Sequence, residues 1–154
     1  MNQQRIYLDT SIFGGLYDEE FREYTEPLFQ RIKNAEFSVI FSNITAQELE
    51  NAPKKVKDTI KLLPKNLMEY VKSDIESANL AKRYIEEGVV GPTSYADCLH
   101  IALATIHNVN ILVSWNFKHI VNITRIVGYN SVNVVQGYKP IDIRSPRELI
   151  IYED

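Results

Sequence analysis

This 154-residue chain contains short runs of consecutive apolar residues. Longer segments with helical periodicity separate these runs. Because apolar residues within the runs do not alternate with polar ones, the runs are typical of strands buried on both faces of a sheet. We expect strands at 6–9, 37–41, 111–113 and 141–143. The run at 67–71 also suits a helix, but its place after a proline favours a strand.

Between these runs, apolar residues recur every three or four positions, as on the buried face of a helix. Helices are expected at 19–35, 45–51, 53–63, 74–87 and 94–107, then helical turns from 117 to about 128, and a segment without a clear period to 137. A last helix begins at Ser145-Pro146-Arg147-Glu148, which combines a proline suited to the first helical position with a Ser-x-x-Glu capping box.

The alternation of strands and helices predicts an α/β protein with a mainly parallel sheet covered by helices on both faces. In such sheets, ligands bind beyond the carboxyl ends of the strands, where the strand order reverses. The length fits one domain spanning 1–154, and we find no internal repeat or linker that would divide it.

The net charge, the cysteine content and the length of the apolar stretches exclude several classes of protein. A net charge of −3 gives no large positive field that would hold nucleic acid by charge alone, so a nucleic-acid role needs a local site. The one cysteine, Cys98, excludes an intramolecular disulfide and a Cys-rich zinc site. The longest apolar stretch, 101–113, is interrupted by polar residues and is too short to cross a bilayer. We therefore expect a soluble, cytoplasmic protein without membrane contact.

Three acidic residues lie at positions that point to one site. Asp9 ends the first strand, Glu48 lies on the short helix after the second strand, and Asp97 lies in the first turn of the most apolar helix. Since these positions share the carboxyl edge of a parallel sheet, the three side chains are expected to converge. Neighbouring carboxylates do not all ionise without a positive charge between them, and carboxylate oxygens suit Mg²⁺ or Mn²⁺. Such a cation supplies what phosphodiester hydrolysis needs.

Each acid also has a purely structural interpretation. The segments 45–48 and 94–97 both match the capping box, in which the acid only satisfies the first amide of its helix. Asp9 is typical of an Asx-turn, although Thr10, Ser11 and the two glycines that follow leave room for a ligand.

Residues elsewhere in the chain have the same two interpretations. Asn116, after the strand at 111–113, is either a turn residue or part of the site. His100, on the apolar helix, is typical of a core histidine, whereas His119, just past Asn116, suits a site better. The basic run 54–57 is either a solvated helix face or a contact for a phosphate backbone.

Taken together, these motifs resemble the ordered set of PIN-domain proteins, especially the VapC-like toxins. The resemblance rests on Ile6-Tyr7-Leu8-Asp9-Thr10-Ser11, Thr45-x-x-Glu48, Asp97-x-x-His100-Ile101-Ala102-Leu103-Ala104 and Leu112-Val113-Ser114-Trp115-Asn116-Phe117-Lys118-His119. It implies a three-layer α/β/α sandwich around about five mainly parallel strands and a metal-dependent endoribonuclease activity. It further implies that Asp9, Glu48 and Asp97 coordinate Mg²⁺ or Mn²⁺, that RNA is the substrate, and that a small antitoxin and a second copy of the chain are partners.

The chain departs from the family pattern at Asn116, where many members carry a fourth acid. An amide contributes no charge, so the expected site carries −3 rather than −4 and binds a second cation less well. We expect Asn116 and His119 to position the scissile phosphate, with His119 donating a proton to the leaving oxygen, and Thr10, Ser11 and Ser114 to help position the substrate.

The sequence also allows two other functions to be considered beside a ribonuclease: a binding module and a dinucleotide-binding protein. A PIN-like module that has lost activity and only binds RNA or another protein would keep the same fold. A dinucleotide-binding protein is disfavoured because the turn after the first strand lacks the G-x-G-x-x-G pattern.

Overall fold

The computed structural model describes residues 3–151, in which five strands form one parallel sheet. The strands are β1 (Gln4–Leu8), β2 (Phe37–Ser42), β3 (Met68–Val71), β4 (Ile111–Val113) and β5 (Asp142–Arg144). Their order is β3-β2-β1-β4-β5, and every neighbouring pair is parallel. This confirms the expected parallel sheet, including its strand at 67–71. The order reverses at β1, so the crevice beyond the carboxyl ends of β1 and β4 is where a ligand is expected.

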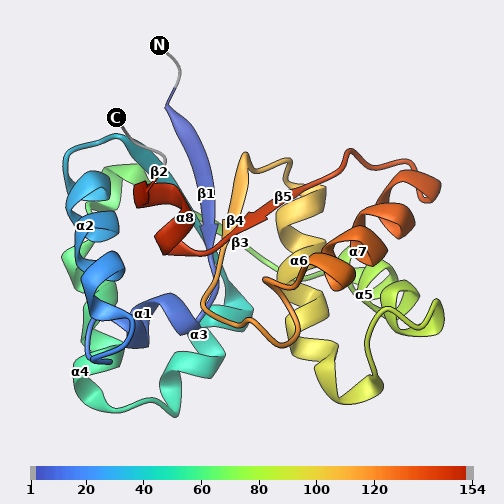
Figure 1. Ribbon diagram of the computed structural model, residues 1–154, viewed down its shortest axis with the longest axis horizontal. Coiled ribbons are helices and arrows are strands. Elements are labelled where there is room, and N and C mark those ends of the chain that lie inside the picture. The colour runs from blue at the N-terminus through green and yellow to red at the C-terminus, as the bar shows by residue number, and fades with distance from the viewer. Residues whose placement is uncertain (1–2, 152–154) are drawn as a thin grey trace.

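Helices cover both faces of the sheet and complete a three-layer α/β/α sandwich (Figure 1). One face carries α1 (Ser11–Gly15), α2 (Arg22–Lys33), α4 (Lys54–Lys57) and α8 (Pro146–Ile151), and the other carries α5 (Ile75–Glu86), α6 (Tyr95–Ile106) and α7 (Ile123–Val135). The helix α3 (Asn43–Glu50) lies at the carboxyl edge, sending Ile44 to one core and Leu49 to the other. Within the described residues, no helix has the length and hydrophobicity that crossing a bilayer requires.

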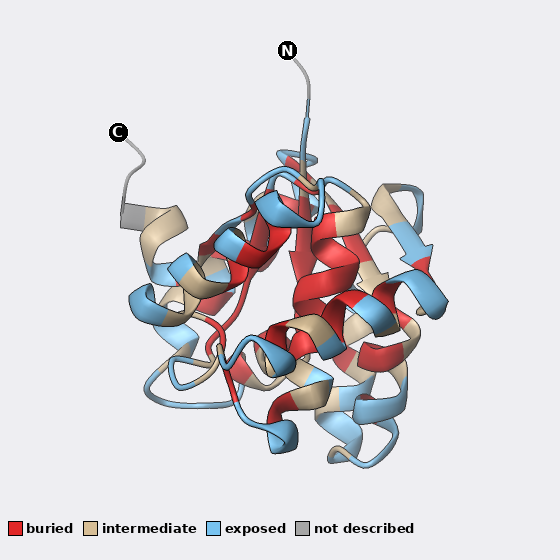
Figure 2. Ribbon diagram, turned by 90° about the vertical axis from the view of Figure 1, so that its right-hand side faces the viewer, coloured by how far each residue is buried: buried red, intermediate tan, exposed pale blue. Residues whose placement is uncertain are grey.

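Successive residues of the central strand supply two separate cores. In β1, Tyr7 packs with the α5–α6–α7 layer, whereas Ile6 and Leu8 pack with the α1–α2 layer. All three are fully buried because helices cover both faces, which is why the apolar residues run consecutively. Figure 2 shows the result: the central strands and the inner faces of the helices are buried, and the outer faces of the helices are exposed.

Two expected helices have different bounds in the structure. The helix expected from 19 begins at Arg22, because residues 18–21 form a turn in which the Asp18 carboxylate accepts from the Glu20 N–H at 2.8 Å. The helix expected over 53–63 is divided into α4 and a 3₁₀ segment, Asp58–Leu62.

The segment after Asn116 was only partly predicted. A loop extends to Asn122, whose side chain accepts from the Arg125 N–H and starts α7, and this helix then continues to Val135. Gly128 does not end the helix as the sequence suggested. A Cβ there would lie 2.8 Å from the Val89 side chain, so this glycine instead permits close packing.

Candidate functional site

The carboxyl edge of the sheet brings together the acidic residues singled out from the sequence. Asp9 directly follows β1, Glu48 lies on α3, Asp97 lies in the first turn of α6, and Asn116 lies on the loop after β4. Figure 1 shows these elements meeting below the central strands. The elements that carry these residues therefore lie at one edge of the sheet, and hydrogen bonds show how each side chain is held.

Asp9 is the most deeply buried of the acids, with an exposed fraction of 4%. The Ser11 hydroxyl donates to Asp9 Oδ1 at 2.6 Å, and the Trp115 N–H in turn donates to the Ser11 oxygen at 2.9 Å. Burial raises the pKa of Asp9 to about 6, although the charge of His100 and the Ser11 hydroxyl lower it, and the charge of Asp97 raises it further. A cation would offset the buried negative charge.

Glu48 does not form the capping box that its spacing suggested. The helix α3 begins two residues earlier than expected, at Asn43, and Ser42 is its N-cap. Glu48 Oε1 instead accepts from the Thr10 hydroxyl at 2.7 Å and lies 2.6 Å from His100 Nε2. Partial burial raises the pKa of Glu48, but the hydrogen bonds of His100 and Thr10 outweigh it and hold this pKa below its usual value.

His100 is a buried and satisfied histidine, as expected, but one of its partners belongs to the candidate site. The ring is 1% exposed, and its Nδ1 lies 2.6 Å from the Tyr7 hydroxyl, which contacts the Ser42 hydroxyl at 2.7 Å. A chain of polar contacts thus extends from Ser42 through Tyr7 and His100 to Glu48. Tyr7 was not predicted as part of the site; its one signal in the sequence is a hydroxyl between two aliphatic residues, Ile6 and Leu8.

Asp97 is likewise free of the structural role that its spacing suggested. Ser94 precedes the helix, but its side chain makes no capping hydrogen bond, so the capping box is not formed. Asp97 Oδ1 accepts from Asn116 Nδ2 at 3.3 Å. Burial raises the pKa of Asp97, the charges of His119 and His100 lower it, and the charge of Glu48 raises it.

Asn116 serves both the loop and the candidate site. Its Oδ1 accepts from the Lys118 and His119 N–H groups at 3.2 and 3.0 Å, while its amide donates to Asp97. The His119 carbonyl accepts from the Tyr129 hydroxyl at 2.6 Å, which fixes the backbone on the other side. Within the described residues, the buried His119 Nδ1 has no hydrogen-bond partner.

Ser114 contacts both the loop and Asp9. It is fully buried, its hydroxyl accepts from the Asn116 N–H at 2.9 Å, and its hydrogen bond to Asp9 lowers the pKa of that carboxyl. A Cβ at Gly15 would lie 2.7 Å from the Thr25 hydroxyl and 2.8 Å from the Trp115 indole nitrogen. At Gly14, by contrast, a Cβ would meet nothing within 4 Å. Of the two glycines that follow Asp9, only Gly14 therefore has open space beside it for a ligand.

The acids do not form a ready metal cluster. Across residues 3–151, no group of three or more His, Cys, Asp and Glu side chains is placed to hold a metal ion. Glu48 is engaged by Thr10 and His100, and Asp97 by Asn116. The donor chemistry nevertheless fits a hard divalent cation, because the group offers carboxylate oxygens, and burial raises the pKa of both Asp9 and Asp97.

The raised pKa of Asp9 leads to a prediction about stability without divalent cations. This pKa is 3.8 ordinarily and about 6 in the folded chain, so between these values the folded state binds protons more tightly. The contribution of Asp9 is therefore fully present below about pH 4 and is lost as the pH rises through about 6, by about 3 kcal/mol.

Urea unfolding of the wild type and of Asp9→Asn, both in EDTA, measures this contribution. Asp9→Asn should be the more stable protein at pH 7, and the two free energies of unfolding should converge near pH 4. A difference that does not change with pH would contradict the prediction.

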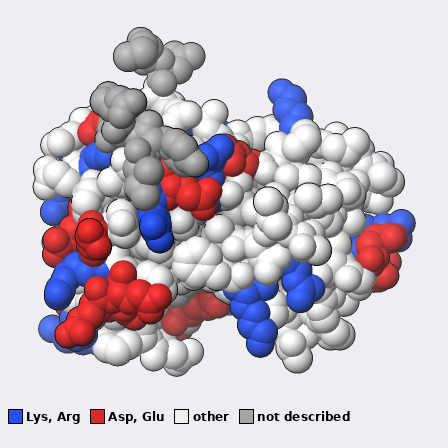
Figure 3. Space-filling view, viewed as in Figure 1, with Lys and Arg blue, Asp and Glu red and all other residues white. Residues whose placement is uncertain are grey.

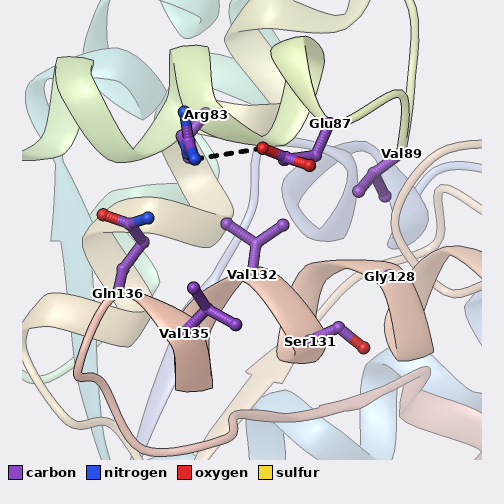
Figure 4. A pocket seen from close by; sticks show the side chains of 8 residues that line it. All are labelled: Arg83, Glu87, Val89, Gly128, Ser131, Val132, Val135 and Gln136. Carbon is purple, nitrogen blue, oxygen red and sulfur yellow. Dashed lines mark ion pairs between the residues drawn. The ribbon is translucent and has the colours of Figure 1, made fainter.

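A cavity of about 290 Å³ lies apart from these carboxylates, between α5 and α7 (Figure 4). Valines line much of it, and its two charged residues, Arg83 and Glu87, pair with each other at 3.1 Å. Since none of the predicted site residues lines it, this cavity is not assigned to the same chemistry.

Comparisons with known proteins agree with the architecture. The chain matches the family model of the PIN domain over residues 6–118. No curated protein matches it. Three solved structures are similar to this chain. VapBC2 from Rickettsia felis, bound to a DNA fragment from their promoter, is 15% identical with a TM-score of 0.55, and FitAcB from Neisseria gonorrhoeae is 14% identical with a TM-score of 0.60. A toxin–antitoxin complex from Klebsiella pneumoniae is 20% identical with a TM-score of 0.53. The first two alignments each cover 92% of this chain and 98% of the other, and the third covers 73% and 88%.

Proposed function

Because this chain belongs to the PIN domain family, we propose that it is a metal-dependent endoribonuclease and the toxin of a toxin–antitoxin pair. The nuclease proposal is supported mainly by the surroundings of three acidic residues. Asp9 is buried with a raised pKa, and neither Glu48 nor Asp97 is used as a helix cap. Acids that lie at one sheet edge and cap no helix favour a shared site over two helix caps and a turn.

In this proposal, Asp9, Glu48 and Asp97 hold Mg²⁺ or Mn²⁺. The cation supplies a positive charge that activates water and offsets the charge developing on the phosphate. The hydroxyls of Ser11 and Thr10 orient Asp9 and Glu48 through the hydrogen bonds described above. Asn116 orients Asp97 and, through its carbonyl, fixes the loop that carries His119. His119 donates a proton to the leaving oxygen.

The toxin role is supported by two of the similar structures, VapBC2 from Rickettsia felis and a toxin–antitoxin complex from Klebsiella pneumoniae. A small antitoxin protein is the partner in this proposal, and the chain acts as a homodimer in the cytoplasm. Co-expression with a short protein encoded next to it tests the toxin role separately from the nuclease role: the partner should restore growth that the chain alone prevents.

Cleavage of a labelled RNA by the purified protein, with Mg²⁺ or Mn²⁺ and with EDTA, tests the nuclease. Cuts that require the cation support the proposal. A folded protein that binds RNA but cuts it with neither cation would favour the alternative, a PIN-like module that only binds, and Asn116 would then be the first residue to convert to an acid.

His119→Ala gives a prediction for the proton donor. General acids contribute about 10²–10⁴-fold to a rate, so turnover should fall by about 10²-fold or more while Mn²⁺ affinity stays unchanged. Single-turnover cleavage and a Mn²⁺ titration of the same preparation measure the two quantities. An unchanged cleavage rate would remove His119 from the mechanism.

A further inference from the structure

The strand β3 lies at one edge of the sheet and pairs with β2 on one side only. In the part of the chain that the structure describes, no strand lies along its other side, so backbone N–H and C=O groups that point that way have no strand to pair with. The two middle residues of the strand, Glu69 and Tyr70, are exposed. The free edge of β3 is therefore accessible to an additional strand.

An apolar hollow of about 620 Å³ lies beside this edge. Phe41 of β2 and Met68 of β3 line it from the sheet, and Ile60 and Leu63 line it from the segment that leads into β3. The Tyr70 ring is 47% exposed and meets the Phe41 ring at 5.1 Å, which extends the apolar surface along the strand. Because side chains alternate along a strand, a strand added at β3 would place every second side chain on the face of the hollow.

Lysines surround the hollow and follow the strand. Lys61 and Lys65 line the hollow, Lys72 comes directly after β3, and all three are exposed. On the face of the molecule shown in Figure 3, several basic side chains lie beside acidic ones. By composition, residues 54–72 differ, with six lysines and two acidic residues in a chain whose net charge is −3. Lysines at a sheet edge repel a second copy of the same edge, but they attract an acidic strand.

The two acidic residues of this segment pair with basic side chains of the protein, which offset their charge. Lys61 Nζ lies 3.2 Å from Asp58 Oδ1, and Arg5 Nη2 lies 3.1 Å from Glu69 Oε2. The hollow and the free edge together suit an extended peptide, because in strand addition main-chain hydrogen bonds supply affinity and alternate side chains occupy pockets. An RNA backbone would use the lysines but not the unpaired strand edge.

We propose that the free edge of β3 binds an extended acidic segment of a partner protein as an added strand. Apolar side chains of that segment enter the hollow, and its carboxylates lie beside Lys61, Lys65 and Lys72. This surface shares no residue with the candidate site, so the inference does not depend on the proposed nuclease. Since β3 has only four residues, the contact is small and of the transient class.

Fluorescence anisotropy with the labelled peptide Glu-Leu-Glu-Phe-Glu-Leu-Glu tests the inference. Its sequence is the same in both directions, so it presents one pattern to β3 whether it pairs parallel or antiparallel. A peptide with lysine in place of glutamate tests the charge. Two N-methylated peptides, one modified at the apolar residues and the other at the acids, test the backbone pairing, because alternate N–H groups of a strand point to opposite sides.

The wild type should bind the acidic peptide saturably and at least about 10-fold more tightly than the lysine peptide. One N-methylated peptide should lose affinity by about 10-fold or more, and the other should keep it. Lys65→Glu should bind the acidic peptide about 3- to 10-fold more weakly. Lys139→Glu is the matched control, because it reverses the same charge at an exposed position outside the hollow, and it should bind as the wild type does.

Equal affinity for the two N-methylated peptides would overturn the inference, as would no saturable binding of the acidic peptide at about 1 mM. Binding of a single-stranded RNA in EDTA that Lys65→Glu weakens, without binding of the peptide, would make the surface a nucleic-acid contact instead. Self-association that Lys65→Glu alters and Lys139→Glu does not, measured by sedimentation, would assign the edge to a second copy and also contradict the proposal. Since none of these measurements involves cleavage, their outcome is separate from that of the proposed nuclease.

Discussion

Asp9→Asn is expected to lower the rate of Mn²⁺-dependent RNA cleavage by about 10³-fold or more. Asp9 is the most buried acid of the candidate site, and its charge is the one that a cation would offset most. Losing a carboxylate that holds the cation removes several kcal/mol of transition-state stabilisation, and about 4 kcal/mol corresponds to about 10³-fold in rate. Single-turnover cleavage of an unpaired oligonucleotide in saturating Mn²⁺ measures the effect.

Glu19→Gln is the matched control for Asp9→Asn. It removes the same charge from an exposed position in the connection between α1 and α2, away from the carboxyl ends of β1 and β4. The cleavage rate of this variant should stay within about twofold of the wild type. Since Asp9→Asn is also expected to be the more stable protein in EDTA at pH 7, unfolding cannot explain a lost rate. Cleavage by Asp9→Asn within tenfold of the wild type would exclude Asp9 as an essential ligand.

His100→Leu is expected to lower both stability and cleavage. The substitution leaves Ser42 as the remaining partner of the Tyr7 hydroxyl and Thr10 as the remaining donor to Glu48, and a lost hydrogen bond to a charged group costs about 1.5–3 kcal/mol. Because Glu48 is then held by Thr10 alone, we also expect Mn²⁺ affinity to fall by about 10-fold or more, as for other groups that orient ligands. Urea unfolding and a Mn²⁺ titration measure the two effects.

Tyr7→Phe separates positioning from general destabilisation. It removes the hydroxyl that contacts His100 Nδ1 but keeps the contact of His100 Nε2 with Glu48. This variant should lose stability, by about 1–3 kcal/mol, and keep most of its Mn²⁺ affinity. If Tyr7→Phe and His100→Leu weaken Mn²⁺ binding equally, His100 does not act by orienting Glu48.

The fold was largely predictable because its central strands are buried on both faces. Ile6, Tyr7 and Leu8 are consecutive apolar residues because Tyr7 packs against one helical layer and its two neighbours pack against the other. The sequence-based prediction was wrong where one residue type can serve two structural roles. Gly128 looks like a helix end, but it serves close packing against Val89, a contact between segments that sequence periodicity does not report.

The candidate site was predictable as a set of residues but not as a set of contacts. Order and spacing led to Asp9, Glu48 and Asp97, while the capping-box alternatives were excluded only when α3 began at Asn43 and Ser94 formed no cap. The polar chain from Ser42 to Glu48 joins residues of two strands and two helices. Tyr7 and His100 are 93 positions apart, so no local pattern contains their contact.

Binding of Mn²⁺ to the protein, followed by electron paramagnetic resonance after removal of all divalent cations, tests the metal site most directly. Glu48 and Asp97 are engaged by neighbouring side chains, so the site exists only if a cation can bring their carboxylates together with Asp9. We predict saturable binding by the wild type and by Glu19→Gln, and binding at least about 10-fold weaker in both Asp9→Asn and Asp97→Asn. Equal Mn²⁺ affinity in all four proteins would show that these carboxylates do not form a metal site.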